Sequence, residues 1–507
     1  MHACLCIDEI VRLIAWELVG SGGEATAVAL ACCHKGFEDP ALDVLWENRL
    51  GVTELLKTLP EDVWDSHGYM VCSGNIIRSP TYPSGHPQSL RRLPTKLEWI
   101  RLQEYARRIR TLADSAELIP LQILRVLQSH ASNEPFLPNL NSLDLWDITE
   151  DLIPLVSSFL SPRITSISLS FECGHPKAAV FSFIKILPTL CPNLQKIDLQ
   201  PLSEGPEITV AISEMLLVTN RDILQKLHVD SPLTKAANEL FCKLPNLRDL
   251  QVILDGPGPL PTFVLPNLTT MAVEYDDNHD WLEGFRGATL GKLSSFTSSS
   301  GSSTISDFLE TFESVTPTTS ISATLSEFYL YGSRSGRPNY RSLLQFTRLK
   351  KLRINFPCGG DCPSTIDDHI ITDLARAMPE LEILHLGAAP CNTASGITIK
   401  GLAALAHYCL RLSQLCVHFQ VTTLDPPTIR HIVPGGNFTM PREDCALTDL
   451  EVGGIHLSEG SALMVALTLL RIFPRLKSIN YLNPGWEEVA RAIRASKGLV
   501  DRSSKGH

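Results

Sequence analysis

A short apolar pattern recurs along most of this 507-residue chain and constrains its fold more than any other feature. The pattern is apolar-x-x-apolar-x-apolar. Its clearest copies read LPNLNSLDL at 137–145, CPNLQKIDL at 191–199, LPNLRDLQV at 244–252 and LPNLTTMAV at 265–273. Further copies follow at 346–354, 378–386, 409–417 and 473–481, and weaker ones lead with Ile164, Leu224, Leu290, Leu325 and Leu447. Such self-similarity is typical of a repeat array, so a single-core globule is not expected.

The spacing of the copies indicates which kind of array this is. Their lead apolar residues, from Leu140 to Leu476, lie 21 to 35 residues apart, which brackets one leucine-rich-repeat unit. The alternation within each copy predicts a short strand, and a four-residue spacing such as Ile370, Leu374 and Met378 predicts helices between strands. One unit cannot bury its own apolar face, so neighbours must share a core. The predicted fold class is an α/β leucine-rich-repeat solenoid, a horseshoe.

Residues 4–50 carry a different pattern, which predicts a small three-helix module. Residues 25–33 form a nearly wholly apolar second helix, and residues 39–46 a third. Helices this short cannot bury all of this apolar surface among themselves, which implies a partner surface. The first helix is marked by an apolar stripe of Ile7, Ile10, Val11, Ile14 and Leu18.

Within this segment one order of residues stands out: Glu9, Ile10, Val11 and Ile14, then Leu30, Ala31, Cys33 and Phe37, then Leu45 and Trp46. In these residues the segment resembles the F-box, the module that docks substrate receptors onto the Skp adaptor of Skp-cullin-F-box ubiquitin ligases. The proline usual just before the F-box glutamate is replaced here by Ile7-Asp8. The phrases at 41–46, 59–64 and 97–112 are similar to the F-box leucine-rich-repeat proteins abundant in mushroom-forming fungi, as is the cysteine-containing repeat from Ile397.

The resemblance implies a substrate-recognition subunit of a Skp-cullin-F-box E3 ubiquitin ligase. The repeat array would bind an unknown protein substrate on its concave face, and the chain itself would do no chemistry. A leucine-rich-repeat interaction or scaffold protein without adaptor binding is the alternative, because the F-box proline is absent. The residues expected to contact the Skp adaptor are Ile7, Glu9, Ile10, Ile14, Leu30, Cys33 and Phe37.

The alternation within the late strands predicts a substrate-binding surface. Because successive side chains point to opposite faces of a strand, the residues between the apolar positions should face the concave side. Tyrosine and arginine are enriched at binding hot spots, which favours an acidic or phosphorylated target segment here. A solvated polar face explains the same pattern equally well. The residues expected to bind substrate are Tyr329, Tyr331, Lys351, Arg353, His385 and His418.

Composition divides the chain into four expected segments. The F-box-like module covers 1–50, and a helical linker region covers 51–130, with a mobile Pro/Gly/Ser-rich loop at 80–94. The repeat solenoid covers 131–485 and is interrupted by a Ser-rich loop at 294–303. A C-terminal helix and tail cover 486–507.

Charge and cysteine usage argue against several other functions. The net charge of −11 and pI near 5.8 argue against nucleic-acid or membrane partners, and the apolar stretch at 462–470 is too short to span a bilayer. The fourteen cysteines are interpreted as reduced, buried thiols of a cytoplasmic or nuclear protein. The Cys/His groups at 32–34 and 358–362 lack a second spaced pair for zinc, and 367–369 lacks a nucleophile motif. No metal, cofactor or enzymatic activity is expected.

Overall fold

A computed structural model divides the chain into two compact units, Met1–Ala237 (unit 1) and Asn238–His507 (unit 2). The structure describes residues 7–503 apart from a set of gaps. Those gaps are 66–70, 73–74, 77–88, 116–124, 127–134, 172–177, 201–204, 256–257, 277–278, 302–303, 317–320, 333–337, 357–365, 388–395, 421–444, 453–456, 458–460 and 482–483.

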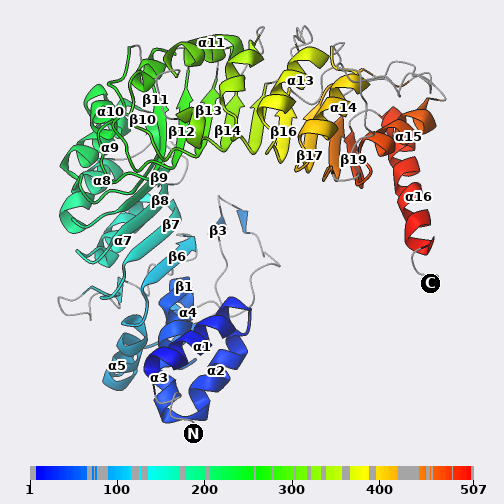
Figure 1. Cartoon of the computed structure of the whole chain (residues 1–507). Helices are drawn as coiled ribbons and strands as arrows, with labels where there is room; N and C mark the ends of the chain where they lie inside the picture. Colours follow the sequence, from blue (N-terminus) through cyan, green and yellow to red (C-terminus); the bar gives the residue numbers. More distant parts are fainter. Residues whose placement is uncertain are drawn as a thin grey trace. The chain divides into compact units, whose positions relative to one another are not determined.

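Unit 1 begins with the three-helix module that the sequence predicts (Figure 1). Its helices are α1 (Asp8–Gly20), α2 (Glu24–Cys33) and α3 (Lys35–Glu47). Small side chains let these helices approach closely, and the buried centre of the module consists of Ala15, Ala31, Ala41 and Val44. Because alanine buries little apolar surface, so small a core stabilises the module weakly by itself.

The repeat sheet starts much earlier than the sequence predicts. Directly after α3, β1 (Asn48–Leu50) pairs in parallel with β6 (Thr111–Ser115), so the expected boundary at residue 131 is wrong. Neither strand carries the complete apolar-x-x-apolar-x-apolar pattern: in β6, Ile109 and Leu112 fit it, but Asp114 takes the last apolar position. The segment between them contains α4 (Val52–Leu56) and α5 (Lys96–Ala106), together with the short strands β2 (Trp64–Asp65), β3 (Val71–Cys72), β4 (Asn75–Ile76) and β5 (Ser89–Leu90).

The predicted mobile loop at 80–94 lies mostly outside the described residues. Its described end contains β5, which pairs with β2 in antiparallel fashion. Thr95 then caps α5 through a capping box with Glu98. The end of this segment is therefore ordered structure.

The remaining strands of unit 1 follow the predicted repeats. They pair in parallel, and Leu143, Ile167, Ile197 and Leu227 form one buried row across them. The strands are β7 (Ser142–Ile148), β8 (Ser166–Phe171), β9 (Lys196–Gln200) and β10 (Lys226–Pro232), and the intervening helices are η3 (Glu150–Leu152), α7 (Ile153–Phe159), α8 (Ala178–Leu190) and α9 (Pro206–Val218).

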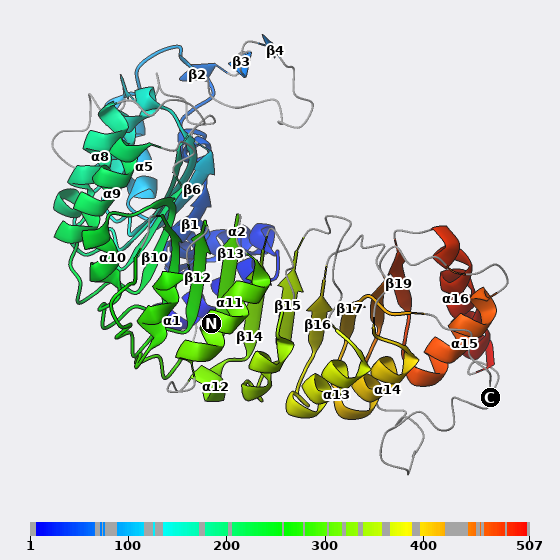
Figure 2. The ribbon, with the colours of Figure 1, turned by 90° about the horizontal axis from the view of Figure 1, so that it is seen from above.

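Unit 2 continues the same architecture after α10 (Lys235–Phe241), which crosses the border between the units. Its helices run along one side of the strands (Figure 2). The strands are β11 (Asp249–Leu254), β12 (Thr270–Tyr275), β13 (Ser295–Ser300), β14 (Glu327–Tyr331), β15 (Lys351–Asn355), β16 (Ile383–Leu386), β17 (Gln414–Val417), β18 (Asp449–Val452) and β19 (Ser478–Tyr481). The helices are η4 (Asp280–Phe285), α11 (Ile305–Val315), α12 (Ile321–Thr324), η5 (Tyr340–Gln345), α13 (Asp368–Ala377), α14 (Ile399–Tyr408), α15 (Ala462–Ile472), η7 (Pro484–Trp486) and α16 (Glu487–Ser503).

The α/β leucine-rich-repeat solenoid is thus confirmed in both units. Each strand of unit 2 pairs in parallel with the next, and its inward residues stay in register. Leu352, Leu384, Leu415 and Leu450, for example, form one buried row. The C-terminal helix expected at 486–507 is present as α16, and residues 504–507 lie outside the described part.

The predicted Ser-rich loop at 294–303 is wrong, because residues 295–300 form strand β13. This strand pairs with β12 on one side and β14 on the other. The repeat that contains it reads LGKLSSFTS from Leu290, so Ser298 stands where most copies have an apolar residue. Ser298 is fully buried beside the inward ring of Phe296. Composition alone indicated a loop, but the neighbouring strands and rings supply the core that the serines lack.

Candidate functional site

The first candidate surface lies on α1. The apolar stripe predicted there is divided by the fold: Val11 points into the module and is 1% exposed, whereas Ile7 and Ile14 are 46% and 37% exposed. Leu13 and Trp16 on the same helix are exposed as well, at 66% and 57%. Monomeric soluble surfaces rarely gather this many large apolar side chains on one short helix, which favours an interaction surface.

Of the other residues predicted to contact the adaptor, some are exposed and some pack inside the module. Glu9 and Cys33 are exposed, and Ile10 is half-buried. Leu30 packs against the alanine core of the module. Phe37 is buried, with its ring 5.3 Å from that of His34, so it offers a partner only a small part of its surface.

Ion pairs fix α3 to the segment that precedes β6. The Arg108 guanidinium donates to the carboxylates of both Asp39 and Asp43, and Arg12 of α1 donates to Asp43 as well. The rings of Trp46 and Tyr105 lie 4.8 Å apart. Because α3 also runs directly into β1, the module is held to the start of the sheet by covalent, ionic and aromatic contacts.

The second candidate surface is the open face of strands β14 to β18. The register places Tyr329, Arg353, His385, Cys416 and Glu451 side by side on five neighbouring strands. The predicted alternation is therefore correct for Tyr329, Arg353 and His385, which the fold brings into one row. We call these five residues the face row.

An adjacent row reduces the positive charge expected on this surface. Lys351 pairs with Glu327, with Nζ 2.7 Å from Oε1, and the Tyr329 hydroxyl donates to Oε2 of the same carboxylate at 3.3 Å. The hydrogen bond to Glu327 raises the pKa of Lys351. The charge of Lys351 is thus balanced within the chain, and Arg353 is the better candidate for binding an anionic target.

Arg353 brings to the face row a guanidinium whose Nε donor lacks a hydrogen-bond acceptor among the described residues. Its guanidinium carbon lies 5.9 Å from the centre of the Tyr329 ring, in a cation–π arrangement. Its Nε is buried and has no hydrogen-bond partner among the described residues. A buried unpaired donor costs free energy, so an acceptor supplied by a bound partner would stabilise this position.

Tyr331 and His418 are not members of the face row itself, but each follows a face-row residue, Tyr329 or Cys416, by two positions. Tyr331 is 37% exposed and is paired in register with Asn355, at the end of its strand. His418 is half-buried and follows the last residue of β17. Because side chains two positions apart point to the same face of a strand, Tyr331 lies one row beyond Tyr329 on the predicted substrate surface.

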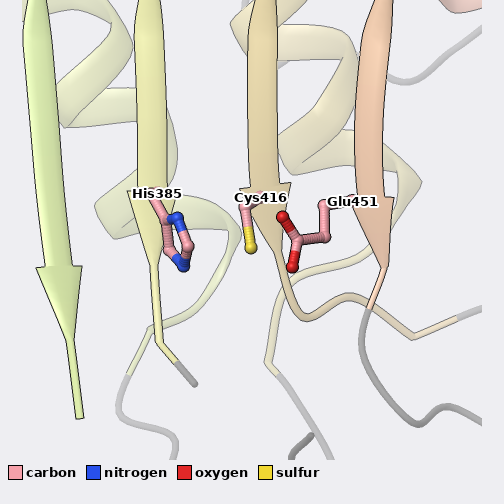
Figure 3. A group of neighbouring side chains, drawn as sticks. All are labelled: His385, Cys416 and Glu451. Carbon is pink, nitrogen blue, oxygen red and sulfur yellow. The ribbon is translucent and has the colours of Figure 1, made fainter. Parts of the chain in front are cut away.

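The sequence reasoning missed Cys416 and Glu451. Cys416 stands at an x position of its repeat, between Leu415 and Val417, and the register places it beside His385 on the open face. The ligand atoms of His385, Cys416 and Glu451 all lie within 4.8 Å of one another, and Figure 3 shows the three side chains converging from neighbouring strands. Burial and then the Glu451 carboxylate raise the pKa of the Cys416 thiol to about 12, whereas burial lowers the pKa of His385.

The cysteines were predicted to be buried, and the described ones agree with this only in part. Cys191, Cys242, Cys409, Cys416 and Cys445 are buried and free. Cys32 and Cys33 are free but exposed at the end of α2. In the described residues, no helix has the length and apolar character that crossing a bilayer requires.

Comparisons with known proteins report no relative in sequence. No family model matches the chain, and no curated protein does. Among solved structures, an internalin (InlF) from Listeria monocytogenes is similar with a TM-score of 0.38 and 14% identity, covering 75% of this chain and 89% of that one. The Rad7 and Elc1 complex from yeast is similar with a TM-score of 0.35 and 15% identity, covering 77% of this chain and 92% of the other.

Proposed function

We propose that the chain is the substrate-recognition subunit of a Skp-cullin-F-box ubiquitin ligase. The observation that carries the proposal is the exposed apolar surface of α1, on a three-helix module that continues without a linker into the first strand of a repeat array. Sequence resemblance of this module to the F-box supports the Skp adaptor as its partner. The repeat array would then hold a target protein.

Such a receptor acts by tethering. Adaptor binding through α1 and target binding through the strand face would raise the effective concentration of the target near the ubiquitin-loaded enzyme. The contacts that fix α3 to the sheet suit this role, because a rigid joint limits the volume that a bound target can sample. The chemistry would be carried out by other subunits.

A pull-down with purified Skp adaptor tests the proposal. We expect the full chain to bind, and we expect Ile7→Asp with Ile14→Asp to weaken binding by at least about 100-fold, because each buried isoleucine contributes roughly 1.5–3 kcal/mol. The matched control is Leu463→Asp with Leu467→Asp, two leucines of α15 that are 61% and 53% exposed. The control should bind like the wild type.

The outcomes separate the two functions that the sequence allows. If the wild-type chain does not bind the adaptor, the scaffold alternative is favoured. If both double variants bind equally, α1 is not the adaptor surface. Circular dichroism on each variant checks that the repeat array stays folded.

A further inference from the structure

Three potential metal ligands lie at successive positions of the face row. His385 is on β16, Cys416 on β17 and Glu451 on β18, and the strands pair in parallel at these residues. Neighbouring strands lie about 4.8 Å apart, so the three backbone positions are evenly spaced. The short cysteine stands in the middle, and the longer histidine and glutamate lean toward it from both sides (Figure 3).

This set of ligand atoms suits one metal in particular. An imidazole nitrogen, a thiolate sulfur and a carboxylate oxygen are the three ligand types that Zn²⁺ takes in proteins. In a tetrahedral site with bonds of about 2.0–2.3 Å, ligand atoms lie about 3.3–3.8 Å apart. The observed separations are within 4.8 Å, so side-chain shifts of about 1 Å would complete the geometry.

We propose that His385, Cys416 and Glu451 bind a single Zn²⁺ ion on the open face of the sheet. The site would rest on three hydrogen-bonded strands, which hold ligands more rigidly than loops do. Binding replaces the proton of the Cys416 thiol with the metal, and that proton leaves to solvent. One thiolate and one carboxylate neutralise the charge of the ion, and the fourth position is left to water or an anion.

The surroundings of the cluster are compatible with this assignment. Cys416 is buried, and His385 and Glu451 are half-buried, so the ion would be partly shielded from solvent. Arg353, the next residue of the face row, has a buried Nε without a partner among the described residues. An anionic fourth ligand beside Arg353 would give that donor an acceptor. Without metal, the Cys416 thiol hydrogen-bonds to the Glu451 carboxylate.

Zinc binding by the purified full chain tests the proposal. The chain is stripped with a chelator, dialysed against Zn²⁺ and assayed for retained metal, and its affinity is measured by competition with a chromophoric zinc indicator. We expect one equivalent of bound zinc. Even residues that only orient a metal ligand contribute about 10- to 100-fold to affinity, so we expect a loss of at least about 100-fold in Cys416→Ser and at least about tenfold in Glu451→Gln. With Co²⁺ in place of zinc, the wild type should show a thiolate-to-metal charge-transfer band that Cys416→Ser lacks.

The exposed thiols of α2 provide the matched control. Cys32→Ser with Cys33→Ser removes two cysteines outside the proposed site and should leave both zinc stoichiometry and affinity unchanged. Glu451→Gln keeps the side-chain shape, so its zinc affinity tests the proposed site even if Cys416→Ser fails to fold. The proposal is wrong if the wild-type chain retains no zinc, if both ligand variants bind zinc like the wild type, or if the α2 control loses the metal. None of these results depends on adaptor binding.

Discussion

Strands β13 and β14 are neighbours in the same sheet, yet different kinds of inward side chain hold them in the core. In β14 the inward residues are Phe328 and Leu330, as the repeat pattern predicts. In β13 they are Phe296 followed by two serines, Ser298 and Ser300. Both strands nevertheless pair along their length. A strand can therefore lack most of the inward apolar residues of the repeat pattern and still pair with both neighbouring strands.

The compensation comes from an aromatic cluster around β13. The ring of Phe296 lies 5.6 Å from Phe312 of α11 and 5.7 Å from Phe328 of β14. Phe285 and Phe308 complete the surroundings, with ring centroids 5.7 Å and 6.4 Å from that of Phe296. Because aromatic side chains bury large apolar areas, a few rings replace the contacts that the serines cannot make.

The open faces of the two strands differ as well. The register pairs Thr297 of β13 with Tyr329 of β14 and then Arg353 of β15. Across these three strands the exposed side chain changes from the small hydroxyl of Thr297 to the ring of Tyr329 and the guanidinium of Arg353. The inward residues of a strand thus determine its packing, and its outward residues determine the chemistry of the open face, independently of each other. Three predictions test this difference, from the largest expected effect to the smallest.

Removing the central ring of the cluster should break the support of β13. Phe312 lies within 5.8 Å, between ring centroids, of Phe285, Phe296, Phe308, Phe328 and Phe346. We expect Phe312→Ala to lower the free energy of unfolding by about 3–5 kcal/mol, measured by chemical denaturation. Amide hydrogen exchange should also accelerate more in β13 than in β16. Equal acceleration in the two strands would contradict a special dependence of β13 on the rings.

The difference between the open faces should appear in target binding. Once a target has been identified by affinity purification from the native cell, Tyr329→Ala with Arg353→Ala should weaken its binding by about 2 kcal/mol or more, as at interface hot spots. Thr297→Ala on β13 is the matched control and should change binding little. The melting temperature should stay nearly constant in all variants, because these side chains lie outside the core. Unchanged target affinity in the double variant would rule out this surface.

The two inward serines of β13, Ser298 and Ser300, should respond in opposite directions to alanine. The Ser298 Oγ is buried without a hydrogen-bond partner among the described residues, whereas the Ser300 Oγ donates to the Asp276 carbonyl at 2.7 Å. We expect Ser298→Ala to raise the free energy of unfolding by about 1 kcal/mol and Ser300→Ala to lower it by a similar amount. Denaturant titration measures both. A loss of stability in Ser298→Ala would show that its hydroxyl has a stabilising role.

The repeat strands and the amino-terminal helices follow from the sequence alone. Apolar spacing identified β7, β9, β15 and β16, because a period of two with a fixed lead-in is a local property of the chain. The same alternation correctly placed Tyr329, Arg353 and His385 on the open face. Apolar residues at helical spacing predicted the module of α1, α2 and α3.

Only the tertiary structure decided which parts of these patterns are buried and which side chains meet. It turned Val11 inward and Ile14 outward, made the serines of β13 part of a core, and joined β1 to β6 across a long insertion. It also brought Cys416 beside His385 and Glu451, residues 31 and 35 positions away along the chain. The physical reason is that parallel register couples residues one whole repeat apart, and burial depends on neighbouring repeats.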